Sequence, residues 1–161
     1  MKKNVIEIEN LKTYFDVSKG LFKAGKNVVK AVDDISFEIA QGKSLGLVGQ
    51  SGCGKTTTAR SITMLEEKTD GNIKFFDESQ NKMISIDDLS EDQIKNFRRN
   101  VQMIFQDPYE AMNPRWTIKD TILEPLIIHN IGTDKEQEEA VIEILKTVGL
   151  TPPENYLSRY P

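Results

Sequence analysis

The chain has 161 residues, of which 38% are hydrophobic and 29% are charged, a balance typical of a globular domain in solution. Its net charge of −4, with Lys and Arg scattered along the chain, excludes the basic patch that nucleic-acid binding needs. One cysteine excludes an internal disulfide, and no uncharged apolar run is long enough for a signal peptide or a membrane span. We therefore expect a cytosolic protein with no nucleic-acid partner and no direct membrane insertion.

Three short segments in the first half of the chain are predicted to be strands. Residues 5–9 and 35–39 alternate apolar and polar side chains, and residues 72–76 follow an Asp-Gly turn. Alternation is typical of strands with one buried and one wet face, so it indicates an antiparallel sheet. Residues 16–30 are rich in Lys and Gly, which predicts a loop or a hairpin insertion.

Two further segments are almost entirely apolar at their ends. Residues 43–48 finish in Leu-Gly-Leu-Val, and residues 101–105 finish in Met-Ile-Phe. Such runs are typical of parallel strands that are covered on both faces. The first run leads into a glycine-rich turn, from which a helix is predicted to continue to about Met64.

The remaining elements are predicted to be helices. Patterns of the capping-box type begin at Ser90, Thr117 and Thr133, where a hydroxyl residue is followed three positions later by Gln, Asp or Glu. The first of these helices ends near residues 98–99, and the last ends before Gly149. The last third of the chain is therefore predicted to be a helical subdomain.

The sequence GQSGCGKTT, residues 49–57, has the spacing of a phosphate-binding loop. Glycines are needed because backbone N–H groups must point inward around an anion, and side chains would block the tight turn. Lys55 is expected to reach the terminal phosphates as a point charge. Thr56 offers a hydroxyl to Mg²⁺, and the start of the following helix adds partial positive charge.

Two alternative functions of this loop are weaker. A dinucleotide-binding fingerprint that includes Gly52 and Gly54 needs glycine at position 57, where Thr57 stands. A redox or nucleophilic role for Cys53 lacks both a nearby histidine and a resolving cysteine. Phosphate binding is therefore the better interpretation.

A triphosphatase also needs groups that hold the metal and the attacking water. No aspartate follows a second apolar strand convincingly; Asp77 imitates one, but Lys74 interrupts that strand, so Asp77 is interpreted as a turn residue. Gln106 ends the apolar run 101–105. A glutamine at the carboxyl end of a strand in an α/β sheet points toward the ligand edge, so its amide can touch metal or water there.

The phrases GLVGQSGCGKTT and MIFQDPYEAMNPRWTI, taken in this order, resemble the ATP-binding cassette family, and most closely the ATPase subunits of bacterial oligopeptide and dipeptide importers. The resemblance covers essentially the whole chain. It implies an α/β fold: a P-loop NTPase core with an antiparallel β-subdomain over residues 1–106, and a Q-loop with the start of an α-helical subdomain over residues 107–161.

The resemblance also implies a role for individual residues. Phe15, or alternatively Tyr14, stacks on adenine. Gln106 contacts Mg²⁺ and the attacking water, and with Lys55 it forms the catalytic pair present in this chain; Thr56 and Gln106 are the expected metal contacts. The residues expected to bind ATP with its Mg²⁺ are Phe15, Gly49, Ser51, Gly52, Cys53, Gly54, Lys55, Thr56 and Thr57.

In the family, the ATPase forms a head-to-tail dimer with a second ATPase subunit and binds transmembrane permease subunits at the inner face of the cell membrane. The resemblance therefore implies a cytoplasmic, peripheral protein. Residues 107–116 are expected to respond to the membrane subunits.

The chain departs from the family after NYLSRYP. The family continues there into a signature motif, a Walker B aspartate with a catalytic glutamate, and a switch histidine. We therefore expect the N-terminal part of a longer ATPase, which binds nucleotide at most. The alternatives are a stand-alone, non-catalytic nucleotide-binding module and a small P-loop kinase, although the paired Arg98 and Arg99 precede the apolar run instead of lying in a lid.

Overall fold

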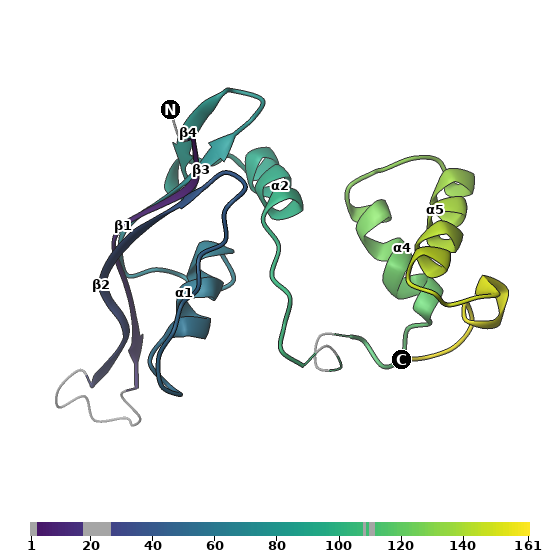
Figure 1. Cartoon of the computed structure of the whole chain (residues 1–161), viewed down its shortest axis with the longest axis horizontal. Helices are drawn as coiled ribbons and strands as arrows, with labels where there is room; N and C mark the ends of the chain where they lie inside the picture. Colours follow the sequence, from purple (N-terminus) through teal and green to yellow (C-terminus); the bar gives the residue numbers. More distant parts are fainter. Residues whose placement is uncertain (1–2, 18–26, 108, 110–111) are drawn as a thin grey trace. The chain divides into compact units, whose positions relative to one another are not determined.

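The computed structural model describes residues 3–17, 27–107, 109 and 112–161. The chain divides into two compact units, residues Met1–Met103 and Ile104–Pro161. The first unit is built on a sheet, and the second is helical (Figure 1). The phosphate loop belongs to the first unit, whereas Gln106 belongs to the second.

The sheet of the first unit has four strands in the order β2-β1-β3-β4, and each neighbouring pair is antiparallel. The strands are β1 (Asn4–Asp16), β2 (Val28–Ala40), β3 (Asp70–Asp77) and β4 (Lys82–Ser85). The predicted antiparallel strands lie within β1, β2 and β3, which confirms them. The predicted loop at 16–30 is shorter at both ends, because β1 continues to Asp16 and β2 starts at Val28; residues 18–26 lie outside the described residues.

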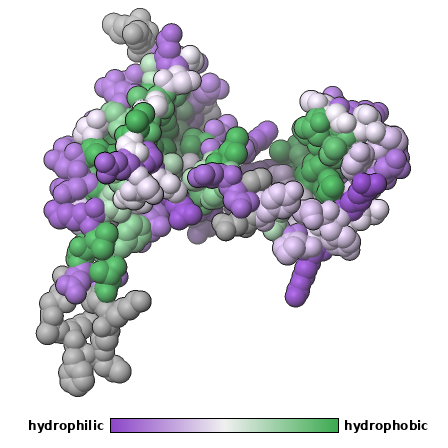
Figure 2. Space-filling model, turned by 60° about the horizontal axis from the view of Figure 1, so that its bottom comes forward, coloured by the Kyte–Doolittle hydropathy of each residue, from purple (hydrophilic) through white to green (hydrophobic). Residues whose placement is uncertain are grey.

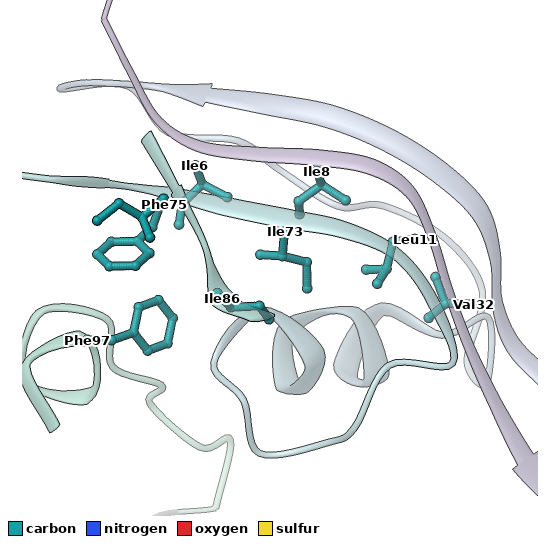
Figure 3. Close-up of a cluster of buried hydrophobic side chains, with 9 residues drawn as sticks. Ile6, Ile8, Leu11, Val32, Ile73, Phe75, Ile86 and Phe97 are labelled. Atoms are coloured by element: carbon teal, nitrogen blue, oxygen red, sulfur yellow. The ribbon is translucent and has the colours of Figure 1, made fainter. Parts of the chain in front are cut away.

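One face of this sheet carries the core of the first unit. Period-two alternation sends Ile6 and Ile8 of β1 and Ile73 and Phe75 of β3 to the same side, where Figure 3 shows them directed toward Ile86 and Phe97. The cluster consists of Ile6, Ile8, Leu11, Val32, Ile73, Phe75, Ile84, Ile86 and Phe97. The Phe97 and Phe75 rings meet edge to face, with their centroids 4.9 Å apart and their planes at 69°.

Three helical segments accompany the sheet: α1 (Lys55–Ile62), the 3₁₀ turn η1 (Ile86–Asp88) and α2 (Glu91–Asn100). The predicted capping box of α2 is confirmed. The Ser90 hydroxyl accepts from the Gln93 amide at 3.4 Å, and the Gln93 side chain accepts from the Ser90 amide at 2.9 Å. This start places Phe97 on the buried side of α2, while its last-turn Arg98 and Arg99 are exposed.

The two predicted parallel strands are not formed. Residues 43–48 and 101–105 have no regular structure; Val48 is 97% exposed and Ile104 is 96% exposed. The prediction is therefore wrong for the described chain. A parallel strand needs neighbours that pair its N–H and C=O groups and cover both faces, and every strand in the described part of the chain belongs to the antiparallel sheet.

The second unit contains α4 (Ile118–Ile128), α5 (Asp134–Thr147) and the 3₁₀ turn η2 (Pro153–Asn155). Both predicted capping boxes are confirmed: Thr117 pairs reciprocally with Asp120, and Thr133 with Glu136. The helices pack on each other and are joined by an ion pair between Lys119 and Glu138, with 2.6 Å from nitrogen to oxygen. Gly149, with a φ of 82°, follows the end of α5 as predicted.

Helix α4 has a mainly apolar sequence, yet none of its residues is buried. Ile127 and Ile128 are exposed, and Figure 2 shows apolar surface on the unit that carries this helix. Neither α4 nor any other helix in the described ranges is both long and apolar enough to cross a bilayer.

We predict that Phe97→Ala destabilises the first unit by about 3–5 kcal/mol, because it removes a fully buried ring and leaves a cavity against Phe75. Phe105→Ala is the matched control, since Phe105 lies outside the core cluster in a segment without a strand. Urea unfolding, together with hydrogen exchange of the β1 and β3 amides, measures the stability of both variants. Similar losses for the two variants would contradict the core described above.

Candidate nucleotide-binding site

The loop between residues 49 and 55 turns sharply before α1 begins. Gly52 and Gly54 have φ angles of 81° and 89°, which lie in the left-handed region where side chains are strained. Gly54 is the N-cap of α1, and its carbonyl accepts from the Thr58 amide at 2.8 Å and from the Thr58 hydroxyl at 3.0 Å. Glycine at these two positions is therefore required by the backbone itself.

Gly54 also lies very close to the edge strand β2. A Cβ atom at position 54 would be 2.0 Å from the carbonyl oxygen of Ala31, a distance no real contact allows. Ala31 lies where the register of β1 and β2 shifts: Thr13 pairs with Val32, whereas Tyr14 pairs with Lys30. The phosphate loop thus rests on the backbone of the sheet at an irregular position in β2.

The start of α1 is open to an anion. No side chain caps the helix, and its first turn contains no acidic residue. The first-turn N–H groups have no partner within a helix, and they carry the positive end of the helix dipole. Thr56, the first hydroxyl residue of α1, is exposed. These features fit a phosphate group with a metal ion beside it.

The Lys55 side chain folds back into the loop. Its ammonium group donates to the carbonyl oxygens of Gly49 at 2.8 Å and Gln50 at 2.7 Å, and it lies 3.4 Å from the Cys53 sulfur. None of the ion pairs found in the described ranges includes Lys55. Since no carboxylate among the described residues pairs with it, its charge is available to an anion held by the same loop.

Cys53 and Gly49 face each other across this turn. A Cβ atom at position 49 would lie 2.5 Å from the Cys53 sulfur. The predicted loop residues Gly49 and Ser51 to Thr57 are therefore brought together as one continuous turn and first helical turn. Their assignment to nucleotide remains a prediction.

The two candidates for base stacking lie on opposite faces of β1. Thr13 is buried on the face that carries α1, and Phe15, two residues on, shares that face. Tyr14 points to the other face, where its hydroxyl donates to Asp33. Lys30 donates to the same carboxylate at 3.1 Å, and its ammonium lies 5.2 Å from the centre of the Tyr14 ring.

These contacts place Tyr14 in a polar cluster with Asp33 and Lys30. The hydrogen bond to Asp33 raises the pKa of Tyr14, and the same bond lowers the pKa of Asp33. Sequence reasoning left Phe15 and Tyr14 open because neighbouring residues of a strand have no distinguishing spacing. Strand geometry places them on opposite faces of β1, and the choice of stacking residue stays a prediction.

Phe15 has apolar neighbours on its own face. It pairs with Val29 of β2, and Val17 follows two residues later. Val29 is 50% exposed and Val17 is 47% exposed, and Figure 2 shows apolar surface next to the grey segment that follows β1. Sequence analysis missed these valines, since nothing in the sequence indicates which strand pairs with Phe15.

Two other residues singled out by the sequence lie outside this loop and strand. Gln106 lies in the second unit, where it is exposed after the segment without a strand, so its metal role remains a prediction. Asp77 ends β3, and its carboxylate accepts from the Ser79 amide at 2.8 Å and the Gln80 amide at 3.1 Å. The hydrogen bond from the Ser79 hydroxyl lowers the pKa of Asp77, which confirms its interpretation as a turn residue.

Comparison with known proteins gives relatives across nearly the whole chain. The chain is 42% identical to the oligopeptide transport ATP-binding protein AppF of Bacillus subtilis (strain 168), covering 99% of this chain and 46% of the relative. It is 46% identical to the oligopeptide transport ATP-binding protein OppF of the same organism, covering 100% of this chain and 48% of the relative. It is 42% identical to the di/tripeptide transport ATP-binding protein DppF of Pseudomonas aeruginosa (strain UCBPP-PA14), covering 98% and 46%. The chain thus spans about half the length of these relatives.

Solved structures give the same fold. A dimeric, post-hydrolysis structure of the ATP-binding cassette MJ0796 bound to ADP and phosphate superposes with a TM-score of 0.69 at 23% identity, covering 97% of this chain and 61% of that one. A second dimeric structure of MJ0796 superposes with a TM-score of 0.69 at 25% identity and the same coverage. The expected α/β cassette fold is therefore confirmed. The ABC transporter family model matches residues 32–160, and the chain, with its glycine-rich turn at the start of α1, belongs to the ABC transporter family.

Proposed function

We propose that the chain is the nucleotide-binding part of an ATPase subunit that energises a bacterial importer of dipeptides or oligopeptides. The observation that carries this proposal is the phosphate loop, in which the Lys55 ammonium donates to two backbone carbonyls and the following helix start has no side-chain cap. The names of the relatives support the peptide cargo, and the family match favours a transporter ATPase over a small kinase.

In this proposal the triphosphate lies along the amides of residues 52–57. Lys55 exchanges its bonds to the Gly49 and Gln50 carbonyls for the terminal phosphates, which are stronger acceptors because they are charged. The Thr56 hydroxyl, exposed at the start of α1, contacts Mg²⁺. When bound, the metal ion would neutralise part of the charge on the phosphates.

The base lies on the apolar strip formed by Phe15, Val17 and Val29. A flat aromatic side chain with exposed apolar neighbours offers a stacking surface that needs no hydrogen-bond pattern. We propose that Gln106 then approaches the metal and the attacking water through its side-chain amide.

Hydrolysis and transport belong to the full-length protein in this proposal. In this proposal two ATPase subunits pair head to tail and bind permease subunits at the inner face of the membrane; the dimeric cassette structures and the names of the transport relatives support it. The 161 residues offer no carboxylate at the end of a second apolar strand to act as general base. We therefore expect this chain to bind Mg-ATP without releasing phosphate, which a phosphate-release assay tests.

Lys55→Ala is predicted to lower the affinity for Mg-ATP by at least about tenfold, since hydrogen bonds to charged groups contribute about 1.5–3 kcal/mol. Lys43→Ala is the matched control, because Lys43 is exposed and precedes the loop. Isothermal titration of both variants measures the difference. An unchanged affinity in Lys55→Ala would overturn the phosphate-loop assignment.

Gly54→Ala is predicted to abolish most of this binding, because its Cβ cannot fit beside the Ala31 carbonyl and its φ of 89° strains any side chain. Gly46→Ala is the control: a Cβ there has nothing within 4 Å. Nucleotide titration measures the loss of binding, and hydrogen exchange of the α1 amides measures the loss of packing on β2. Wild-type binding by Gly54→Ala would contradict the close packing of the loop on β2.

Phe15→Ala is predicted to weaken ATP binding by about 1–3 kcal/mol through the loss of base stacking. Tyr14→Ala removes a ring from the opposite face and is predicted to leave ATP affinity nearly unchanged. Competition titrations with a fluorescent ATP analogue compare the two variants. A larger loss in Tyr14→Ala would mean that the stacking residue is Tyr14.

A further inference from the structure

A buried hydroxyl pair joins α1 to β1. Thr13 is 0% exposed and Ser61 is 1% exposed, and their side-chain oxygens are 2.9 Å apart. The two groups share one hydrogen bond, in which either hydroxyl can be the donor. A hydroxyl buried without a partner is unfavourable, so each of these residues depends on the other.

This contact is directional, whereas the packing around it is not. Ile62 of α1 packs against the apolar cluster of the sheet, and such contacts depend little on orientation. A hydrogen bond between two short side chains tolerates little displacement, because distance and angle both decide its strength. The pair therefore restrains the position of α1 along β1, in addition to the close approach of Gly54 to Ala31.

The segment that follows α1 is tied to the same part of β1. The Thr69 amide donates to the Lys12 carbonyl at 2.7 Å, and the Thr69 hydroxyl accepts from the Tyr14 amide at 2.8 Å. Residues 12–14 of β1 thus hold both the helix and the segment that leaves it.

The two members of the hydroxyl pair lie on the two elements that carry the parts of the candidate site, α1 and β1. Along α1, Ser61 comes six residues after Lys55, which is about 9 Å at 1.5 Å per residue. Along β1, Phe15 comes two residues after Thr13, which is about 7 Å in a strand. One element therefore leads from the pair to each part of the candidate site.

We infer that the Thr13–Ser61 pair is a positioning element that sets the distance between the phosphate loop and the base-stacking strip. This inference rests on the proposed function of Phe15 and Lys55. Its consequence is selectivity: a ligand with both base and phosphates depends on the pair, whereas a bare polyphosphate depends only on the loop.

The test compares Mg-ATP with Mg-tripolyphosphate by isothermal titration of the full chain. Thr13→Val and Ser61→Ala are each expected to lower ATP affinity about three- to tenfold, the range that one hydrogen bond accounts for. Tripolyphosphate affinity is expected to stay at the wild-type value. Thr13→Ser keeps the hydroxyl and is expected to restore the ratio of the two affinities.

A control variant separates positioning from general loss of stability. Ser85→Ala removes a hydrogen bond of 2.8 Å to Asn72, which joins β4 to β3 away from α1. It is expected to lower the thermal midpoint without changing the affinity ratio. The double variant Thr13→Val/Ser61→Ala leaves no unpaired hydroxyl, so it is expected to be more stable than the sum of the single losses while keeping the altered ratio.

The other outcomes would each contradict a different role. Equal losses for ATP and tripolyphosphate, or an unchanged ratio in folded variants, would overturn the positioning role alone. If the wild-type chain binds tripolyphosphate but not ATP, the base site is overturned, and the positioning role with it. If the wild-type chain binds neither ATP nor tripolyphosphate, the proposed function itself is overturned. If Thr13→Val does not fold, Ser61→Ala against Thr13→Ser decides the same question.

Discussion

The approach of Gly54 to the Ala31 carbonyl is the constraint on which the candidate site depends. A Cβ at position 54 would lie 2.0 Å from that oxygen, so the first residue before α1 can rest on the sheet only as glycine. The same residue adopts a φ of 89°, which turns the chain into the helix without a capping side chain. The helix start is consequently left open to an anion, and Lys55 curls into the loop beside it.

The sheet organises the site through its two faces. Alternation along β1 sends Thr13 and Phe15 toward the side of α1, and it sends Tyr14 to the side where Asp33 and Lys30 form an exposed polar cluster. An aromatic residue whose hydroxyl is already hydrogen-bonded is poorly suited to stack on a base on the other side. Alternation along β1 therefore leaves Phe15, and not Tyr14, on the side of α1.

The two unpaired apolar segments show that strand propensity is not strand formation. Val48 and Ile104 stand at the ends of runs that have the composition of parallel strands, yet both are almost fully exposed. Backbone groups in a strand need hydrogen-bond partners on neighbouring strands of the sheet. The antiparallel strands β1 to β4 do not supply such partners to these two segments. The chain spans about half the length of its curated relatives.

The sequence by itself determined the local features of this protein. The three capping boxes and the glycine pattern of the phosphate loop follow from interactions within a few residues, and the apolar–polar alternation of the antiparallel strands is a local pattern, so composition and spacing are enough to predict them. Only the tertiary structure decided which apolar runs are paired, that Phe15 and Val29 share a face, and that Thr13 meets Ser61. Those contacts join residues 14 to 48 positions apart, and no periodic signal in one sequence records such a pairing.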